Sequence, residues 1–588
     1  MDLSPEEREA GKENFQAAIQ REMLSGSDLD RREFLKGGIL AGAVAGGSLG
    51  AFYFGYEAAD ADPVRVGVIG TGDEGSVLIG AINPDYLQVV SIADIRPYNV
   101  HRAFHGDLYS PAAEAARPGL LKKYGWKTED EARKHVKVYG PYQELIQNAR
   151  EDGVEAVIIA LPLHLHAPAS IVAMRAGLHV LTEKLMGHSV HECKEMARVA
   201  KETHRYLATG HQRHYNILYQ QAVDQIKRGL LGNIHYIRAQ WHRGNLPGSD
   251  SWQQPMPYEA KPDDPQADKL VKQLGSWRRA LSQARGTEID TWRRKVAQLE
   301  AQIADVILSR PAEGAKGTLA EQYGYLTEKY PVPGGKVYDR PAIEELIRWR
   351  LWDRTGGGLM AELGSHQLDA ASIFISATHP GQQKIHPLNV AAAANRPCFP
   401  ADRDVNDHVF CMFEFPAPDY DAKDPIASQR KIGVQYASVN GNGFGGYGEI
   451  VFGTEGTLII EREQEAMLML KESQSKLKVD AGAALDTQAS GPAQVAAEGP
   501  AMQVSRGYTE EEEHWAWCIR QDPRCRDPEV QPRCHPKVAL GDAVIALTTN
   551  AAARKGQRLN FDPAWFDPDD DATPEGIPPE LDREQYTL

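Results

Sequence analysis

One short segment near residue 64 constrains the fold more than any other feature of the sequence. A β-branched run, VRVGVI, leads directly into GTGDEG, which contains a Gly-x-Gly-x-x-Gly pattern. Between a buried strand and a helix, the first glycine permits a tight turn, the second admits a pyrophosphate, and the third lets the helix pack closely. The segment therefore predicts a Rossmann domain. The residues predicted to contact its cofactor are Gly70, Gly72, Asp73, Glu74 and Gly75.

The end of the second predicted strand indicates which dinucleotide is bound. The run LQVVSIAD ends at Asp94. A carboxylate at this position accepts hydrogen bonds from both hydroxyls of the adenosine ribose and repels a 2′-phosphate. We therefore predict NAD in preference to NADP. Arg96 follows shortly after Asp94 and leaves NADP as the alternative.

Two more predicted strands end in residues that suit the same ligand. Pro162 and His166 follow VEAVIIAL, and Glu183 and Lys184 follow HVLT. Because ligands of doubly wound sheets bind beyond the carboxyl ends of the strands, these residues are predicted to lie at the cofactor. The HLH of His164 and His166 has no third ligand at metal spacing, and the six cysteines form no C-x-x-C, so the spacing predicts no metal site.

The charge balance excludes one class of partner. The 588 residues include 65 Lys+Arg and 81 Asp+Glu, for a formal net charge of -16. Nonspecific binding to nucleic acid requires a cationic surface, and the sequence has no basic block that could supply it. We expect no nucleic-acid partner, and the length predicts roughly two to four domains.

The N-terminal region has the pattern of an export signal. DRREFLK, from Asp30, precedes an uncharged Gly/Ala-rich run that ends at Tyr56. This resembles a twin-arginine signal. The resemblance implies that residues 1–61 are a leader cleaved after Ala61, that the twin-arginine translocase is a partner during export, and that the protein acts in the periplasm. The run is also about long enough to span a bilayer, so an uncleaved membrane anchor is the alternative.

The order of motifs along the chain resembles a known family. GTGDEG, Asp94, LPLHLH, AGLHVLTEK, GHQR and GGGLMAELGSHQLD follow one another as in the Gfo/Idh/MocA oxidoreductases, the family of glucose-fructose oxidoreductase and inositol dehydrogenase. The resemblance covers about Val64 to about Phe561, with insertions. It implies an α/β fold, with an N-terminal Rossmann dinucleotide-binding domain and a C-terminal α+β domain that has an open, mainly antiparallel sheet. It also implies a homo-oligomer, a dimer or a tetramer.

These patterns divide the chain into segments. After the leader we expect an NAD-binding Rossmann domain over 62–212 and an α+β substrate and oligomerisation domain over 213–566. The family pattern stops over about 245–340, where apolar residues at helical spacings predict a helical insertion. The acidic, Pro-rich end, 567–588, is expected to be an extended tail.

The resemblance also implies a catalytic set. Glu183-Lys184 corresponds to the family's Glu-Lys-Pro, whose lysine lies beside nicotinamide and substrate, although Leu185 replaces the proline. Glu362 and His366 correspond to its Asp-x-x-x-His, in which the histidine takes the hydroxyl proton. The chemistry is independent of the family: His366 has the intrinsic pKa of a general base, and Lys184 can stabilise an alkoxide. Glu362, one helical turn earlier, is expected to orient the imidazole or to bind a substrate hydroxyl.

Four residues at later strand ends suit a sugar, whose hydroxyl groups need hydrogen-bond partners and whose apolar face stacks on an indole. The candidates are Arg213, His214, Trp241 and His242. A hydrogen-bond network at the domain boundary explains the same residues equally well.

Taken together, the sequence predicts hydride transfer between a sugar or polyol carbinol and NAD. Export implies that the cofactor is tightly bound, because free NAD is not dependably supplied outside the cytoplasm. Two alternatives remain open. One is an NAD-dependent glycosidase or lyase that oxidises C3 transiently, and the other is a non-catalytic sugar-binding protein.

Overall fold

A computed structural model of the protein describes residues 3–25, 53–56, 61–470 and 506–576, apart from positions 312, 313, 315, 333, 334 and 383. Arg31, Arg32 and most of the apolar run after them lie outside the described residues, as does 577–588 of the predicted tail. Within the described part, no helix has both the length and the apolar character needed to cross a membrane.

The first domain is built on a six-stranded parallel sheet with the strand order β3-β2-β1-β4-β5-β6. Its central strands are buried along almost their whole length, because helices cover both faces of such a sheet. The order reverses between β1 and β4, where dinucleotides bind. This confirms the predicted Rossmann domain. The strands are β1 (Val64–Ile69), β2 (Leu87–Ala93), β3 (Lys137–Tyr139), β4 (Ala156–Ile159), β5 (His179–Glu183) and β6 (Leu207–Gly210).

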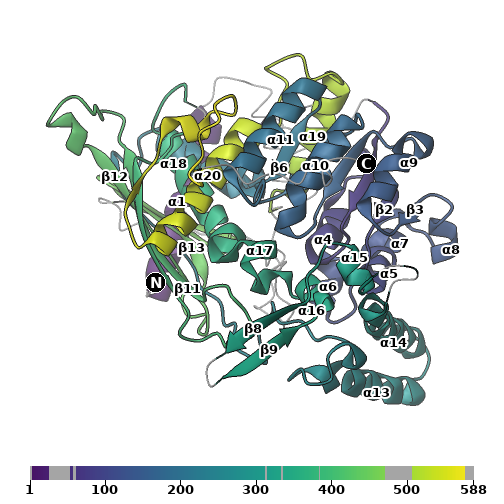
Figure 1. Ribbon diagram of the computed structural model, residues 1–588. Helices are drawn as coiled ribbons and strands as arrows, with labels where there is room; N and C mark the ends of the chain where they lie inside the picture. The colour runs from purple at the N-terminus through teal and green to yellow at the C-terminus, as the bar shows by residue number, and fades with distance from the viewer. Residues whose placement is uncertain are drawn as a thin grey trace.

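Helices flank this sheet in the order expected for repeated βαβ units (Figure 1). They are α4 (Asp73–Ala81), α5 (Pro97–His105), α6 (Pro111–Ala116), α7 (Gly119–Tyr124), α8 (Glu129–Ala132), α9 (Tyr142–Asp152), η1 (Leu163–Leu165), α10 (His166–Arg175), α11 (Val190–Thr203) and η2 (Gln212–Tyr215). Helix α12 (Ile217–Lys227), which comes next, packs against elements of the second domain.

The second domain is built on an eight-stranded sheet with the order β15-β14-β13-β7-β12-β11-β10-β16. Only β7 and β12 pair in parallel, which confirms the predicted, mainly antiparallel sheet. The strands are β7 (Ile234–Trp241), β10 (Asn389–Asn395), β11 (His408–Pro416), β12 (Lys431–Val439), β13 (Tyr447–Gly453), β14 (Gly456–Glu461), β15 (Glu465–Leu470) and β16 (Leu559–Asn560).

Helices from three parts of the chain pack on this second sheet (Figure 1). The N-terminal helix lies on the edge strand β15, where Arg8 pairs with Glu461 at 2.6 Å and Lys12 pairs with Glu465 at 2.8 Å. The helices are α1 (Pro5–Ser25), the π-helical turn η6 (Met360–Gly364), α18 (Ser365–Ser376) and α20 (Pro536–Lys555). The short helix η8 (Pro563–Phe566) packs on α20, and η7 (Ala427–Gln429) lies in the connection between β11 and β12.

The predicted insertion is helical, followed by a small β-hairpin. Helix α14 packs along α5 of the first domain, and Asp305 at its end accepts a hydrogen bond from the backbone N–H of Tyr98 at 3.0 Å. The elements are η3 (Tyr258–Ala260), α13 (Ala267–Gln283), α14 (Glu288–Ala304), η4 (Asp305–Ser309), α15 (Leu319–Gln322), β8 (Glu328–Val332), β9 (Lys336–Arg340), α16 (Ala342–Ile347), η5 (Trp349–Leu351) and α17 (Asp353–Gly356).

One helix near the C-terminus returns to the first domain. Helix α19 (Tyr508–Gln521) packs against α4, β1, β2 and β6. Its Trp515 and Ile519 are buried in the same apolar cluster as Val66 and Val68 of β1. The expected boundary at 212 therefore leaves out part of the first domain's core.

The first residues of the predicted tail pack against α11 of the same domain. The Lys194 ammonium donates hydrogen bonds to the carbonyl oxygens of Ala564, Asp570 and Ala572.

Candidate active site

A cavity of about 680 Å3 lies at the switch point of the parallel sheet. This volume is typical of cofactor and small-molecule sites, which range over about 300–1,000 Å3. The first domain, the insertion and the turn before α18 all contribute to its wall. The cavity therefore joins the predicted cofactor residues to the predicted catalytic residues.

The glycine turn has the geometry that a pyrophosphate requires. Gly70 has φ +84°, and a Cβ at Gly75 would lie 1.9 Å from the carbonyl oxygen of Gly70, so α4 could not approach the turn with any larger residue. A Cβ at Gly72 would meet nothing closer than 3.6 Å, and Gly72 lines the cavity. Because no side chain caps the first turn of α4, its backbone N–H groups are available to an anion. The turn fits a dinucleotide.

Asp94 lines the cavity and is held firmly by backbone and amide donors. Its Oδ2 accepts hydrogen bonds from the N–H of Thr71 at 2.8 Å and from Asn99 at 3.0 Å, and its Oδ1 accepts one from the N–H of Arg96 at 2.9 Å. These bonds fix the carboxylate in the position expected for a ribose-binding residue.

Arg96 is not available as a free cation for a 2′-phosphate. Its side chain is 9% exposed, and its Nε and Nη2 both lie 2.9 Å from Asp305 of the insertion. Because Asp305 already neutralises this guanidinium, the geometry supports the predicted preference for NAD over NADP.

Asp73 and Glu74 both line the cavity, but they have different partners. Asp73 accepts a hydrogen bond from Arg102 at 2.6 Å and another from Gln254 of the insertion at 3.1 Å. Burial raises the pKa of Glu74, and burial together with the nearby Glu74 raises the pKa of Glu183 to about 8. The cavity therefore holds a pair of buried carboxyl groups, of which one retains a proton near neutral pH.

Pro162 and His166 stand at the end of β4, where both line the cavity. The two ring nitrogens of His166 each lie 2.8 Å from a backbone carbonyl oxygen, those of Leu185 and Leu161. His166 therefore ties the turn after β4 to the turn after β5 and positions the cofactor wall. The Lys184–Leu185 peptide bond is cis. The cis geometry is present even though this position carries leucine and not the proline of the family's motif.

Lys184 and Glu362 meet across the domain boundary. The ammonium group of Lys184 donates a 2.6 Å hydrogen bond to the backbone carbonyl of Glu362. The Glu362 carboxylate accepts a 2.7 Å hydrogen bond from Nε of Arg350. Burial by itself would raise the pKa of Glu362, but Arg350 and Lys184 lower it to about 2. Glu362 is therefore an ionised acceptor at neutral pH.

His366 lies behind Lys184 on the wall of the cavity and is 5% exposed. Burial holds its pKa well below the ordinary value, and the positive charges of Lys184 and Arg213 lower it further. Its Nδ1 has no hydrogen-bond partner among the described residues. The imidazole is therefore neutral at neutral pH, and one of its ring nitrogens carries a lone pair. The expected contact with Glu362 is not formed, because the carboxylate of Glu362 binds Arg350 instead.

The predicted substrate residues occupy a different place. None of the four lines the cavity. Arg213 is buried and contacts Glu449, Glu463 and the carbonyl oxygen of His366, with 2.7 Å between its Nη2 and Glu463. His214 lies 3.0 Å from Asp369. Arg213 and His214 thus take part in a buried hydrogen-bond network of the kind that the alternative reading expects.

Trp241 and His242 are also packing residues at this boundary. The Trp241 ring stacks on Tyr447 at 4.3 Å and lies 5.4 Å from the His366 ring. His242 accepts a hydrogen bond from the N–H of Val439 at 3.2 Å. Trp241 therefore supports the imidazole from behind and does not present its face to the cavity.

Several residues of the cavity wall could not be found from the motifs. Gln254 and Tyr325 come from the insertion, Arg350 from the turn after it, and Tyr508 from α19. Each lies outside the quoted patterns, and only the three-dimensional packing brings it to the cofactor cavity.

Comparison with known proteins agrees with this geometry. Residues 64–211 match the family model of Gfo/Idh/MocA, described as an oxidoreductase family with an NAD-binding Rossmann fold. The predicted resemblance to the Gfo/Idh/MocA oxidoreductases is confirmed for these residues. The predicted NAD cofactor is thereby confirmed, because the matched family domain is NAD-binding.

Relatives with different names share this Gfo/Idh/MocA region. A glycosyl hydrolase family 109 protein of Stenotrophomonas maltophilia is 28% identical over 181 residues, 30% of this chain and 35% of the relative. A 1-carboxy-3-chloro-3,4-dihydroxycyclohexa-1,5-diene dehydrogenase of Comamonas testosteroni is 27% identical over 177 residues, 30% of this chain and 37% of the relative. The chain thus spans just over a third of the length of these curated relatives.

Among solved structures, an inositol dehydrogenase homologue from Azotobacter vinelandii, complexed with NADH and myo-inositol, covers 85% of this chain and 98% of its own. It has 13% identity and a TM-score of 0.49.

Proposed function

We propose that this protein is an NAD-dependent oxidoreductase that transfers hydride between a carbinol of a sugar or sugar derivative and a nicotinamide cofactor that stays bound between turnovers. One observation carries the proposal. The dinucleotide turn, Lys184 and His366 line a single cavity, so the cofactor turn and a buried base adjoin the same space.

The side chains divide the chemistry between them. When bound, NAD accepts the hydride from the carbinol carbon. His366, kept neutral by burial, accepts the hydroxyl proton. Lys184 is anchored by the Glu362 carbonyl and retains further N–H donors that can stabilise the developing alkoxide. The ionised Glu362 can accept a hydrogen bond from a neighbouring hydroxyl, which a sugar or polyol supplies.

Retention of the cofactor is part of the proposal. The insertion lies against the nucleotide side of the cavity, where Asp305 holds Arg96 and Gln254 holds Asp73. Release of the cofactor would require these contacts to open. A retained cofactor suits export by the twin-arginine route to the periplasm, which we propose from the leader, since that route carries folded proteins.

The first test is for bound nucleotide. The protein is purified without added cofactor and denatured, and the supernatant is analysed by mass for NAD(H) and NADP(H). Near-stoichiometric NAD(H) is expected. A protein that is empty and also fails to bind added nucleotide would contradict the proposal.

The second test addresses the catalytic side chains. The assay uses a sugar or polyol that the wild-type protein oxidises. In Lys184→Met and His366→Ala, turnover of this substrate should fall by about 10²–10⁴-fold, the usual contribution of a positioned acid or base. Nucleotide content should stay at the wild-type level. Lys122→Met, at an exposed lysine, is the control. Wild-type turnover in both folded, cofactor-loaded variants would overturn the assignment.

A second candidate function is favoured by the carboxyl pair. Glu183 and Glu74 keep a protonated carboxylic acid inside the cavity. Net dehydrogenation does not need such an acid, but a glycosidase or lyase that oxidises C3 transiently needs one to protonate the leaving group. The relative named as a glycosyl hydrolase makes this alternative worth testing.

Aryl glycosides separate the two activities. The second function would be established if wild-type protein releases the aglycone without net reduction of nucleotide and Glu183→Gln no longer releases it. Net reduction of an added acceptor would establish the first. Sugar binding with neither reaction would leave the protein as a binding protein.

A further inference from the structure

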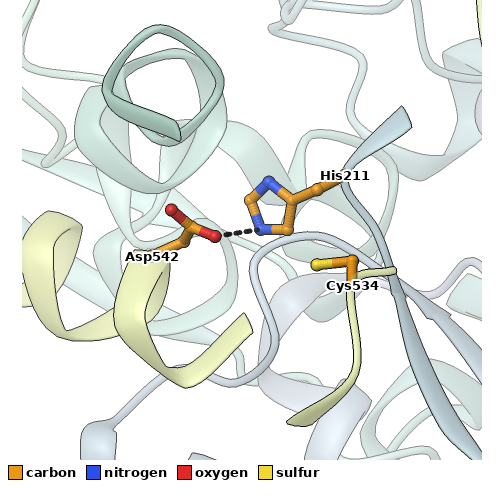
Figure 2. A group of neighbouring side chains, drawn as sticks. All are labelled: His211, Cys534 and Asp542. Atoms are coloured by element: carbon orange, nitrogen blue, oxygen red, sulfur yellow. Dashed lines mark ion pairs between the residues drawn. The ribbon is translucent and has the colours of Figure 1, made fainter. Parts of the chain in front are cut away.

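A second group of chemistry-bearing side chains lies outside the cavity. His211 follows β6 of the first domain, Asp542 is on α20, and Cys534 is in the loop before α20 (Figure 2). Their ligand-type atoms all lie within 4.8 Å of one another, and all three side chains are buried. None of them lines the cofactor cavity. The group is therefore separate from the proposed reaction.

His211 is the strongest sign of a ligand at this place. It is 1% exposed, and among the described residues neither of its ring nitrogens has a hydrogen-bond partner. Its Nε2 lies 4.0 Å from Oδ2 of Asp542, an oxygen that is likewise unpartnered. Figure 2 shows the imidazole and the carboxylate turned toward one another, with the sulfur of Cys534 beside them. A buried imidazole without a partner is costly unless it binds something.

The far side of the imidazole has the support that a metal-binding histidine normally receives. Nδ1 of His211 lies 3.6 Å from Oδ2 of Asp369. This separation is too long for a hydrogen bond, but a small movement of the ring would let Nδ1–H donate to the carboxylate, which would fix the tautomer and direct Nε2 to a metal. Lys384 holds the outer oxygens of both carboxylates, at 3.0 Å from Asp369 and 2.6 Å from Asp542. The inner oxygens remain turned toward the histidine.

We propose that His211, Cys534 and Asp542 bind a structural zinc ion that fastens the first domain to α20, with Asp369 orienting the histidine. A nitrogen, a thiolate and a carboxylate oxygen supply three of the four ligands of a tetrahedral Zn²⁺ site, and a water molecule would supply the fourth. The three ligand atoms lie within 4.8 Å of one another and would have to approach by roughly 1 Å to reach the separations that normal Zn²⁺ bond lengths require. The backbone already joins the same segments, because Thr209 N–H donates to the Cys534 carbonyl at 3.1 Å.

Metal content of the full-length protein tests the proposal. After dialysis against a weak chelator, elemental analysis of wild type should give close to one zinc per chain. Cys534→Ser should lose most of that zinc, while Cys411→Ser, at a buried cysteine in β11, should keep it. Asp369→Asn should weaken zinc binding by about 10–100-fold, the usual effect of losing a supporting carboxylate.

Cobalt gives a readout that does not depend on activity. Wild-type protein stripped of metal and mixed with Co²⁺ should develop the near-ultraviolet thiolate-to-cobalt absorption, which Cys534→Ser should lack and Cys411→Ser should show. If Cys534→Ser does not fold, the wild-type titration alone decides. Substoichiometric zinc in wild type together with no cobalt–thiolate band would overturn the proposal, as would full zinc retention in Cys534→Ser.

Discussion

Glu449 should make the protein's stability fall as the pH rises from acid to neutral, and Glu449→Gln should remove that fall. Glu449 is fully buried in β13, where its carboxylate contacts Arg213 at 3.1 Å and Tyr219 at 2.8 Å. Burial raises its pKa from the ordinary 4.5 to about 7, with Arg213 opposing and Glu463 adding to the shift. The folded protein therefore binds a proton here that the unfolded chain releases.

The sign and size follow from linkage. Because the folded-state pKa is the higher one, the contribution of Glu449 is fully present below about pH 4.5 and is lost as the pH rises to about 7. At about 1.4 kcal/mol per pH unit, the loss amounts to about 3 kcal/mol. Glutamine reproduces the neutral acid: its oxygen can accept from Arg213, and its NH₂ can donate to the Tyr219 oxygen.

Urea unfolding of wild type and Glu449→Gln at several pH values from 5 to 8 measures this. The difference in unfolding free energy between the two should shift in favour of the variant by about 2.5 kcal/mol across this range, since part of the contribution is already lost at pH 5. Glu463→Gln is the matched control in the same network. Arg506 and Arg213 outweigh burial and lower the pKa of Glu463 to about 2, so its loss should destabilise at every pH in the range. A wild-type-to-Glu449→Gln difference that is constant from pH 5 to 8 would refute the reasoning.

Three further predictions concern the cofactor and the base. Asp305→Asn should free the Arg96 guanidinium and raise the ratio of NADP to NAD found in the purified protein, whereas an unchanged ratio would mean that Arg96 does not face the ribose. Gly75→Ala, whose new Cβ would lie 1.9 Å from a carbonyl oxygen, should abolish nucleotide retention and lower Tm, while Gly275→Ala on α13 should do neither. Because the pKa of His366 lies well below 6.5, kcat/KM of wild type should stay level as the pH falls through 6.5, and a decline centred there would contradict the buried base.

The sequence predicts the first domain well because its signals are local. A buried strand, a glycine turn and a carboxylate at the next strand end follow one another within one βαβ unit, and the structure forms each as expected. Lys184 and His366 each lie in a short motif, and the structure places both on the wall of one cavity. The motifs do not show that the two residues share a cavity, because that depends on how the two domains pack.

The rest of the site depends on contacts between distant segments. Arg213 follows a strand end and is polar, as a substrate residue would be, yet it pairs with Glu463 far along the chain. The partner of Glu362 is Arg350, which lies in no motif. The π-helical turn Met360–Gly364 also departs from the α-helical spacing on which the expected Glu362–His366 contact rested. Periodicity specifies which face a residue occupies, but not which buried partner it meets there.

The return of α19 to the first domain affects how the protein is made. Val66 and Val68 leave the ribosome early, but Trp515, which packs in the same core, is synthesised only near the end. Until then the face that α19 covers stays exposed on the nascent chain. The cofactor domain can thus be completed only after the second domain has been translated, and a truncated product would present an open apolar surface to chaperones and proteases.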